Sequence, residues 1–209
     1  MNLNLPLAAH RYYHIYNRGV NRENIFKENR NYIFFLEKYF QFLSPVVDTL
    51  AYCLLRNHFH LLIRVKDEES LCEFHSRRNA RQMNSTGLHS AEFIVSKQFA
   101  KLFSSYTQSV NKVYKRTGSL IETPFKRILV KDENYLTQLI RYIHLNPQKH
   151  RIVDDFRSYE HSSYQGHLDR ADIFLSSDEV INWFGGSEGY IEFHRETSDL
   201  DVIKRLVLE

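Results

Sequence analysis

The sequence predicts an α+β protein, in which helices pack on a ferredoxin-like antiparallel sheet and a short helical appendage follows. The main observation is the order of segments with strand or helix periodicity, which is β-α-β-β-α-β-α. Composition indicates a globular chain that is neither disordered nor fibrous, because 43% of the 209 residues are hydrophobic whereas Gly (7) and Pro (4) are scarce. A chain of this length buries a proper core, so we expect one compact domain with an appendage.

Three strands and one helix are expected at the start of the chain. Residues 12–19 (YYHIYNRG) alternate in polarity and end in Gly, as a strand does. Residues 28–43 carry apolar side chains at helical spacing, and Pro45 lies just beyond their end. Residues 46–55 and 58–66 are strand-like and separated by a short polar turn, so they predict a β-hairpin.

A long helix and a further strand are expected next. Residues 67–88 are polar and resemble a loop or a short helix. Residues 90–118 predict a long helix, with Ser90 as its N-cap and Gly118 at its end. Residues 125–131 (FKRILVK) predict the fourth strand.

The C-terminal third begins with a helix over residues 132–146, which we expect Pro147 to stop. Residues 152–209 then predict an irregular linker and two short helices, 176–185 and 187–196. We therefore divide the chain into a domain of residues 1–151 and an acidic C-terminal extension of residues 152–209.

The composition also excludes several classes of protein. Cys53 and Cys72 are too few for a disulfide framework and lack metal-site spacing, which fits a reducing cytoplasm. The N-terminal residues have no signal-peptide pattern, and no apolar run is long enough to cross a bilayer. We therefore expect a cytoplasmic protein with no membrane partner.

The net charge of +3 is unevenly distributed along the chain. Residues 95–151 carry eleven Lys or Arg against three acidic side chains, whereas residues 152–209 carry five basic and thirteen acidic ones. The basic middle indicates a polyanionic partner or, as the alternative, a solvated helix face.

The motif "HFHLLIRVK" places two imidazoles on one face of the expected strand. Alternate side chains of a strand share a face, so His58 and His60 are neighbours, while Phe59, Leu61 and Ile63 point to the opposite side. Two adjacent imidazoles are explained by a cation that holds them neutral, although such pairs also occur by chance.

The helix "YLTQLIRYIHLNP" carries the other candidate residues. Tyr142 and Asn146 are four residues apart and so lie on one face, beside an apolar stripe that contains Leu139 and Ile143. The amide oxygen of Asn146 suits a hard divalent ion and could complete a His, His, Asn set. The alternative is that Tyr142 is a core-edge aromatic residue and that Asn146 is a helix cap before Pro147. His144 points away from this face and is interpreted as a surface or packing residue.

These motifs together resemble the single-tyrosine HUH (His-hydrophobe-His) transposases, and most closely the REP-associated tyrosine transposases. The resemblance covers most of the chain through four segments: "YHIYNRGVNRENIF" (13–26), "NHFHLLIRV" (57–65), "FSSYTQSVNKVYKRTGSL" (103–120) and "YLTQLIRYIHLNPQKHRIV" (135–153). It implies the HUH endonuclease fold. Two departures are Arg56, where relatives usually have Pro, and the stretch "LIETPFKR" (120–127) before the fourth strand.

The resemblance implies roles for four residues. His58 and His60 would bind the metal, Mg²⁺ or Mn²⁺, and Tyr142 would be the nucleophile. Asn146 takes the place of the family's third ligand, a Gln or Asn one turn beyond the tyrosine. The implied activity is metal-dependent nicking and strand transfer on single-stranded hairpin DNA through a 5′-phosphotyrosine intermediate. No general base for Tyr142 is evident in the sequence.

Basic and polar side chains are the expected DNA contacts. They are Arg18, Asn21, Arg22, Lys97, Lys101, Lys112, Lys115, Arg116, Lys126, Arg127 and Lys131. Tyr106 and Tyr114, which lie among them, are candidates for stacking on bases.

Two rival functions remain open at this point, namely a hairpin-binding module that does not cut and a metal hydrolase that uses activated water. The resemblance implies that the protein is a monomer or a homodimer.

Overall fold

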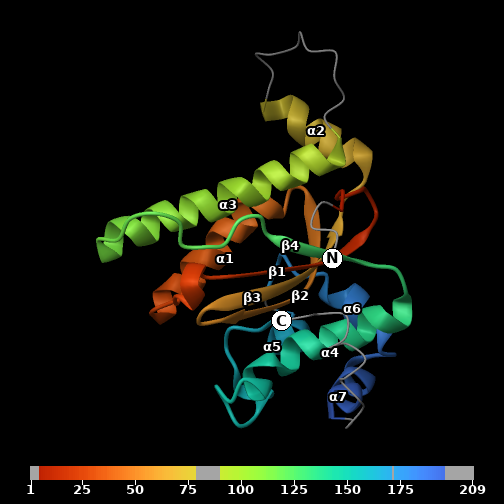
Figure 1. The fold of residues 1–209 in the computed structure, drawn as a ribbon. Helices are drawn as coiled ribbons and strands as arrows, with labels where there is room; N and C mark the ends of the chain where they lie inside the picture. The colour runs from red at the N-terminus through yellow and green to blue at the C-terminus, as the bar shows by residue number, and fades with distance from the viewer. Residues whose placement is uncertain (1–4, 79–89, 171, 196–209) are drawn as a thin grey trace.

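The computed structural model describes residues 5–78, 90–170 and 172–195, and Figure 1 shows one sheet between two layers of helices. The four strands are β1 (Tyr12–Arg18), β2 (Val47–Leu55), β3 (His58–Val65) and β4 (Lys126–Val130). Neighbouring strands are antiparallel, and their order across the sheet is β2-β3-β1-β4. The α+β, ferredoxin-like class expected from the sequence is therefore confirmed.

One face of the sheet is covered by α1 (Asn29–Leu43) and α3 (Ala91–Tyr114). Phe59 of β3 lies between them, with its ring centroid 5.5 Å from that of Phe35 on α1 and 5.7 Å from that of Phe103 on α3. Leu61 and Ile63 of β3 belong to the same core. This is the apolar face that the alternation of β3 predicted.

The other face is covered by α4 (Glu133–Lys149), α5 (Ser163–Asp169), α6 (Ser177–Trp183) and α7 (Ser187–Arg195). Leu62 of β3 and Cys53 of β2 pack there with apolar side chains of α4, including those of Leu139, Ile140 and Ile143. Both faces of the sheet are thus buried. The face of β3 that carries His58 and His60 consequently points toward α4 rather than toward solvent.

The long helix α3 begins as expected, because Ser90 Oγ accepts a hydrogen bond from the Phe93 N–H. Its expected end at Gly118 is wrong, since the helix ends at Tyr114 and Lys115 adopts a left-handed conformation (φ 51°). The carbonyl of Asn111 accepts the N–H groups of both Lys115 and Arg116, which closes the last turn early.

The expectation that Pro147 stops α4 is also wrong, because the helix runs through it to Lys149. Proline cannot donate to the carbonyl one turn earlier, but the next turn is closed by the His150 N–H, which donates to the Asn146 carbonyl at 2.9 Å. Pro147 is buried, and packing of α4 on the sheet offsets the lost hydrogen bond. Asn146 therefore lies inside the helix, which excludes its alternative role as a cap.

The C-terminal extension packs on β2 and α4. The two helices expected at residues 176–185 and 187–196 correspond to α6 and α7, whereas α5 was not anticipated. Backbone hydrogen bonds tie this region to β2, from Leu54 N–H to the His161 carbonyl and from Ser176 N–H to the Thr49 carbonyl, both at 2.9 Å.

The polar segment after β3 contains one helix, α2 (Glu68–Arg78), beside α3. The rest of the segment that was expected to be a loop or a short helix, residues 79–88, lies outside the described residues. None of the described helices has both the length and the apolar character required to cross a membrane.

Candidate functional site

Strands β1 and β3 build a patch of histidine and tyrosine side chains on the face that α4 covers. The register pairs Arg18 with His58 and Tyr16 with His60 across the β1–β3 ladder. Because alternate residues share a face, His14 of β1 lies on the same side, next to Tyr16. The imidazoles of His14 and His60 stack with ring centroids 5.2 Å apart, and that of His60 meets His58 edge-on at 5.3 Å.

Helix α4 lies over this patch through side chains one turn apart. The Tyr142 ring meets His60 edge-on at a centroid distance of 5.8 Å, and the His150 ring meets His58 at 4.9 Å. Asn146 is four residues from each and so occupies the same helix face between them. The structure therefore brings the imidazole pair, Tyr142 and Asn146 to one side of the sheet.

Hydrogen bonds determine which atoms of His58 and Asn146 are available for a ligand. His58 Nδ1 lies 2.8 Å from Asn57 Oδ1, and because that oxygen only accepts, Nδ1 carries the proton and Nε2 the lone pair. Asn146 Nδ2 donates to the Tyr142 carbonyl at 2.9 Å. The remaining oxygen, Asn146 Oδ1, is buried with no hydrogen-bond partner among the described residues. Leaving a carbonyl oxygen so placed costs roughly 1–3 kcal/mol, which calls for a functional explanation.

The buried imidazoles of the patch are neutral. Burial lowers the pKa of His14 to about 3, and burial together with neighbouring histidines lowers the pKa of His60 well below its ordinary value. A neutral imidazole retains one lone pair, which is the form that binds metals. Within the described residues, no three His, Cys, Asp or Glu side chains converge as a metal site.

Tyr142 is only 1% exposed. Its hydroxyl lies 3.5 Å from Lys149 Nζ, and that ammonium lies 4.9 Å from the centre of the Tyr142 ring. Lys149 itself is exposed, so a cation in contact with solvent lies beside the buried phenol.

A cavity of about 390 Å³ opens beside the histidine pair. Its lining includes His58, His60 and His150 together with three of the expected DNA contacts, Arg18, Arg22 and Lys126. Arg18 is paired with Glu122 at 2.8 Å, and the Lys126 ammonium lies 5.6 Å from the centre of the Tyr16 ring. Asn21 adjoins Arg22 in the short helix η1 (Val20–Arg22) and is exposed. The loop after β1 and the start of β4 thus supply positive charge around the cavity.

The remaining expected DNA contacts do not line this cavity. Lys97, Lys101 and Lys112 belong to α3, which covers the opposite face of the sheet, and Lys115 follows its end. Arg116 and Arg127 are largely buried in ion pairs, with Glu23 at 2.6 Å and with Glu92 at 2.8 Å, whereas the side chain of Arg18 stays 45% exposed beside Glu122.

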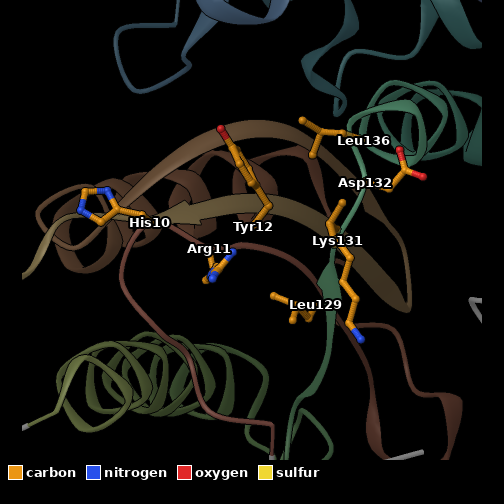
Figure 2. A pocket seen from close by; sticks show the side chains of 8 residues that line it. His10, Arg11, Tyr12, Leu129, Lys131, Asp132 and Leu136 are labelled. Atoms are coloured by element: carbon orange, nitrogen blue, oxygen red, sulfur yellow. The ribbon is translucent and has the colours of Figure 1, made fainter.

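Lys131 lines a second pocket, of about 460 Å³, at the other end of β1 and β4 (Figure 2). Its neighbours in that pocket include His10, Arg11 and Asp132. The pocket is separated from His58 by the length of the strands, because Tyr12 pairs with Val130 at this end whereas Arg18 pairs with His58 at the other.

The suggestion that Tyr106 stacks on bases is wrong. Its side chain is 0% exposed in the core between α1 and α3, and its hydroxyl donates to the Ile25 carbonyl at 2.9 Å. The Tyr114 hydroxyl donates to Glu28 Oε1 at 2.7 Å and so links α3 to the start of α1.

Three residues at the site were not identified from the sequence, namely His14, Lys149 and His150. His14 could have been suspected, because it shares the strand periodicity of Tyr16 and Arg18. His150 and Lys149 reach the site only because α4 continues past Pro147.

No protein-family model matches the chain, and no curated protein matches it. A solved structure described as a REP-associated tyrosine transposase bound to a REP hairpin matches it with a TM-score of 0.58. The match covers 84% of this chain and 88% of that chain, at 11% sequence identity. The chain therefore has the fold of a REP-associated tyrosine transposase.

Proposed function

We propose that this protein nicks single-stranded hairpin DNA and rejoins strands through a covalent 5′-phosphotyrosine on Tyr142. The approach of the Tyr142 ring to His60, at 5.8 Å and on the helix face that carries Asn146, is the observation that carries the proposal. The fold supports the substrate class, because the similar transposase structure is described as bound to a REP hairpin.

His58, His60 and Asn146 are the residues that would hold a divalent ion, Mg²⁺ or Mn²⁺. The fit rests on the buried, unpartnered Oδ1 of Asn146 and on the proton of His58, which Asn57 holds at Nδ1. When bound, such an ion would neutralise charge on the non-bridging oxygens of the scissile phosphate. Two neutral nitrogens and one amide oxygen leave room for phosphate and water oxygens, which both ions prefer.

Tyr142 supplies the nucleophile. Its hydroxyl oxygen forms a bond to phosphorus while the bond from phosphorus to the 3′-oxygen breaks, and the phenol proton is lost as the 3′-oxygen gains one. Lys149 Nζ, 3.5 Å from the hydroxyl, stabilises the negative charge that develops on the phenol oxygen. Since the phosphodiester is conserved as a tyrosyl ester, the 3′-hydroxyl of a second strand can reverse the step and join DNA.

Arg18, Arg22 and Lys126 would position the strand through its phosphates, since they surround the cavity beside the histidine pair.

A denaturing gel of the protein with labelled foldback DNA strands and Mn²⁺ tests the proposal. We expect a labelled band at the size of the protein that is absent in Tyr142→Phe and present in Tyr135→Phe, a matched loss of a hydroxyl on the same helix. Cleavage that survives Tyr142→Phe would assign the protein to the metal hydrolases. Binding without cleavage would make it a hairpin-binding module.

A further inference from the structure

His14 is a fully buried imidazole that the proposed chemistry does not use. It is 0% exposed on β1, and its Nε2 lies 3.0 Å from Nδ1 of His60. The two residues are diagonal neighbours across the ladder, because His14 pairs with Leu62 and Tyr16 pairs with His60. Their rings are nearly parallel, at 19°.

Only one proton lies between these two nitrogens, and its position decides what His60 can bind. A neutral imidazole has one N–H donor and one lone-pair acceptor. If His60 Nδ1 donates to His14, then His60 Nε2 carries the lone pair and can coordinate an ion. If His14 donates instead, His60 Nε2 carries the hydrogen and cannot coordinate.

We propose that His14 is the positioning residue for the metal ligand His60, whose Nδ1–H it accepts at Nε2. This inference rests on the proposed metal site. Metal-binding histidines generally donate their second ring nitrogen to a neighbouring acceptor, which fixes both tautomer and ring orientation. Asn57 already fulfils this role for His58, at 2.8 Å, so the pair would be oriented by two different acceptors.

The surroundings of the second ring nitrogen, Nδ1, also indicate that His14 has a functional role. His14 Nδ1 is buried and has no hydrogen-bond partner among the described residues. The buried His167, by contrast, uses both nitrogens, with the Leu50 carbonyl at 2.9 Å and Ser177 Oγ at 3.2 Å. A histidine kept only for packing should resemble His167, whereas His14 retains one polar atom that packing does not satisfy.

Mn²⁺ binding by the purified full chain, measured by calorimetry, tests the inference with two variants of His14. His14→Leu fills the space but removes the acceptor, and we expect Mn²⁺ affinity to fall 10- to 100-fold. His14→Gln places an amide oxygen near the position of Nε2 and should restore affinity to within about threefold of wild type. His167→Gln, a buried histidine outside the site, is the control for loss of an imidazole.

The tautomer is measured independently by long-range ¹H–¹⁵N NMR of the His60 ring. We expect the proton on Nδ1 in the wild type with Mg²⁺ and in His14→Gln, while His14→Leu loses this preference and retains the wild-type circular dichroism spectrum. Wild-type Mn²⁺ affinity in His14→Leu, or a proton on Nε2 of wild-type His60 with Mg²⁺, would overturn the role of His14 and leave the proposed function intact. If His60→Ala binds Mn²⁺ as tightly as the wild type, the metal site itself is wrong and this inference falls with it.

Discussion

Acid should loosen the C-terminal region from β2 and α4, because three buried histidines lie at these contacts. His167 donates from Nε2 to the Leu50 carbonyl at 2.9 Å, and His194 donates from Nδ1 to the Tyr190 carbonyl at 2.7 Å. His194 Nε2 then accepts from His144 Nδ1 at 2.9 Å, and His144 Nε2 accepts from Ser163 Oγ at 2.8 Å. Each imidazole is neutral, with both nitrogens satisfied.

The size of the loss of unfolding free energy in acid follows from the pKa values of these histidines. Burial lowers the pKa of His167 and of His194 from 6.5 to about 4, and the nearby Arg141 guanidinium also lowers that of His194. Below about pH 7 the unfolded chain therefore binds more protons than the folded chain. The stability that these neutral histidines contribute is complete above about pH 7 and is lost as the pH falls toward 4. Between pH 7.5 and 5.5, each of these histidines should contribute a loss of about 1.4 kcal/mol.

Urea unfolding followed by circular dichroism measures this loss. We expect the free energy of unfolding of the wild type to fall by at least about 3 kcal/mol between pH 7.5 and 5.5. In His167→Gln, whose amide can still donate to Leu50, the fall should be about 1.4 kcal/mol smaller. Gln165→Ala changes an exposed position of the same helix and should leave the fall unchanged. Equal free energies for the wild type at both pH values would refute the reasoning.

Three further predictions concern α4 and the site. Ile143→Ala removes a fully buried side chain between α4 and the sheet and should lower the free energy of unfolding by about 2–5 kcal/mol. A much smaller loss would show that α4 does not pack on the sheet as described. Lys126→Ala should weaken hairpin DNA binding and reduce the slope of log affinity against log salt by about 1. Lys97→Ala, on the opposite face, should change that slope less than Lys126→Ala does. A larger change in Lys97→Ala than in Lys126→Ala would place the DNA on α3. Asn146→Ala should lower Mn²⁺ affinity in calorimetry, whereas unchanged affinity would remove Asn146 from the ligand set.

Local periodicity was sufficient to predict most of the fold. Alternation in β3 placed Phe59 and Leu61 in a core and His58 and His60 on the other face, and both assignments match the structure. Helical spacing likewise placed Tyr142 and Asn146 on one side of α4. These predictions succeeded because strand and helix geometry depends on neighbours in the sequence.

The helix ends were less predictable, because tertiary packing competes with local preferences there. Pro147 should stop a helix by local rules, yet burial of α4 against the sheet carries the helix through it. Charge was equally ambiguous in the sequence. Arg116 and Arg127 counted toward a basic DNA-binding surface, but Glu23 and Glu92, far away in the chain, bind them in ion pairs.

The sequence by itself determined the order of the elements, the shared face of His58 and His60, and the four-residue spacing of Tyr142 and Asn146. Only the tertiary structure decided that α4 covers the histidine face, that His14 contacts His60, and that Lys149 Nζ lies beside the Tyr142 hydroxyl. The reason is that these contacts depend on strand register and on the docking of α4. Both arise from burial of apolar surface by segments distant in the sequence, which local periodicity does not encode.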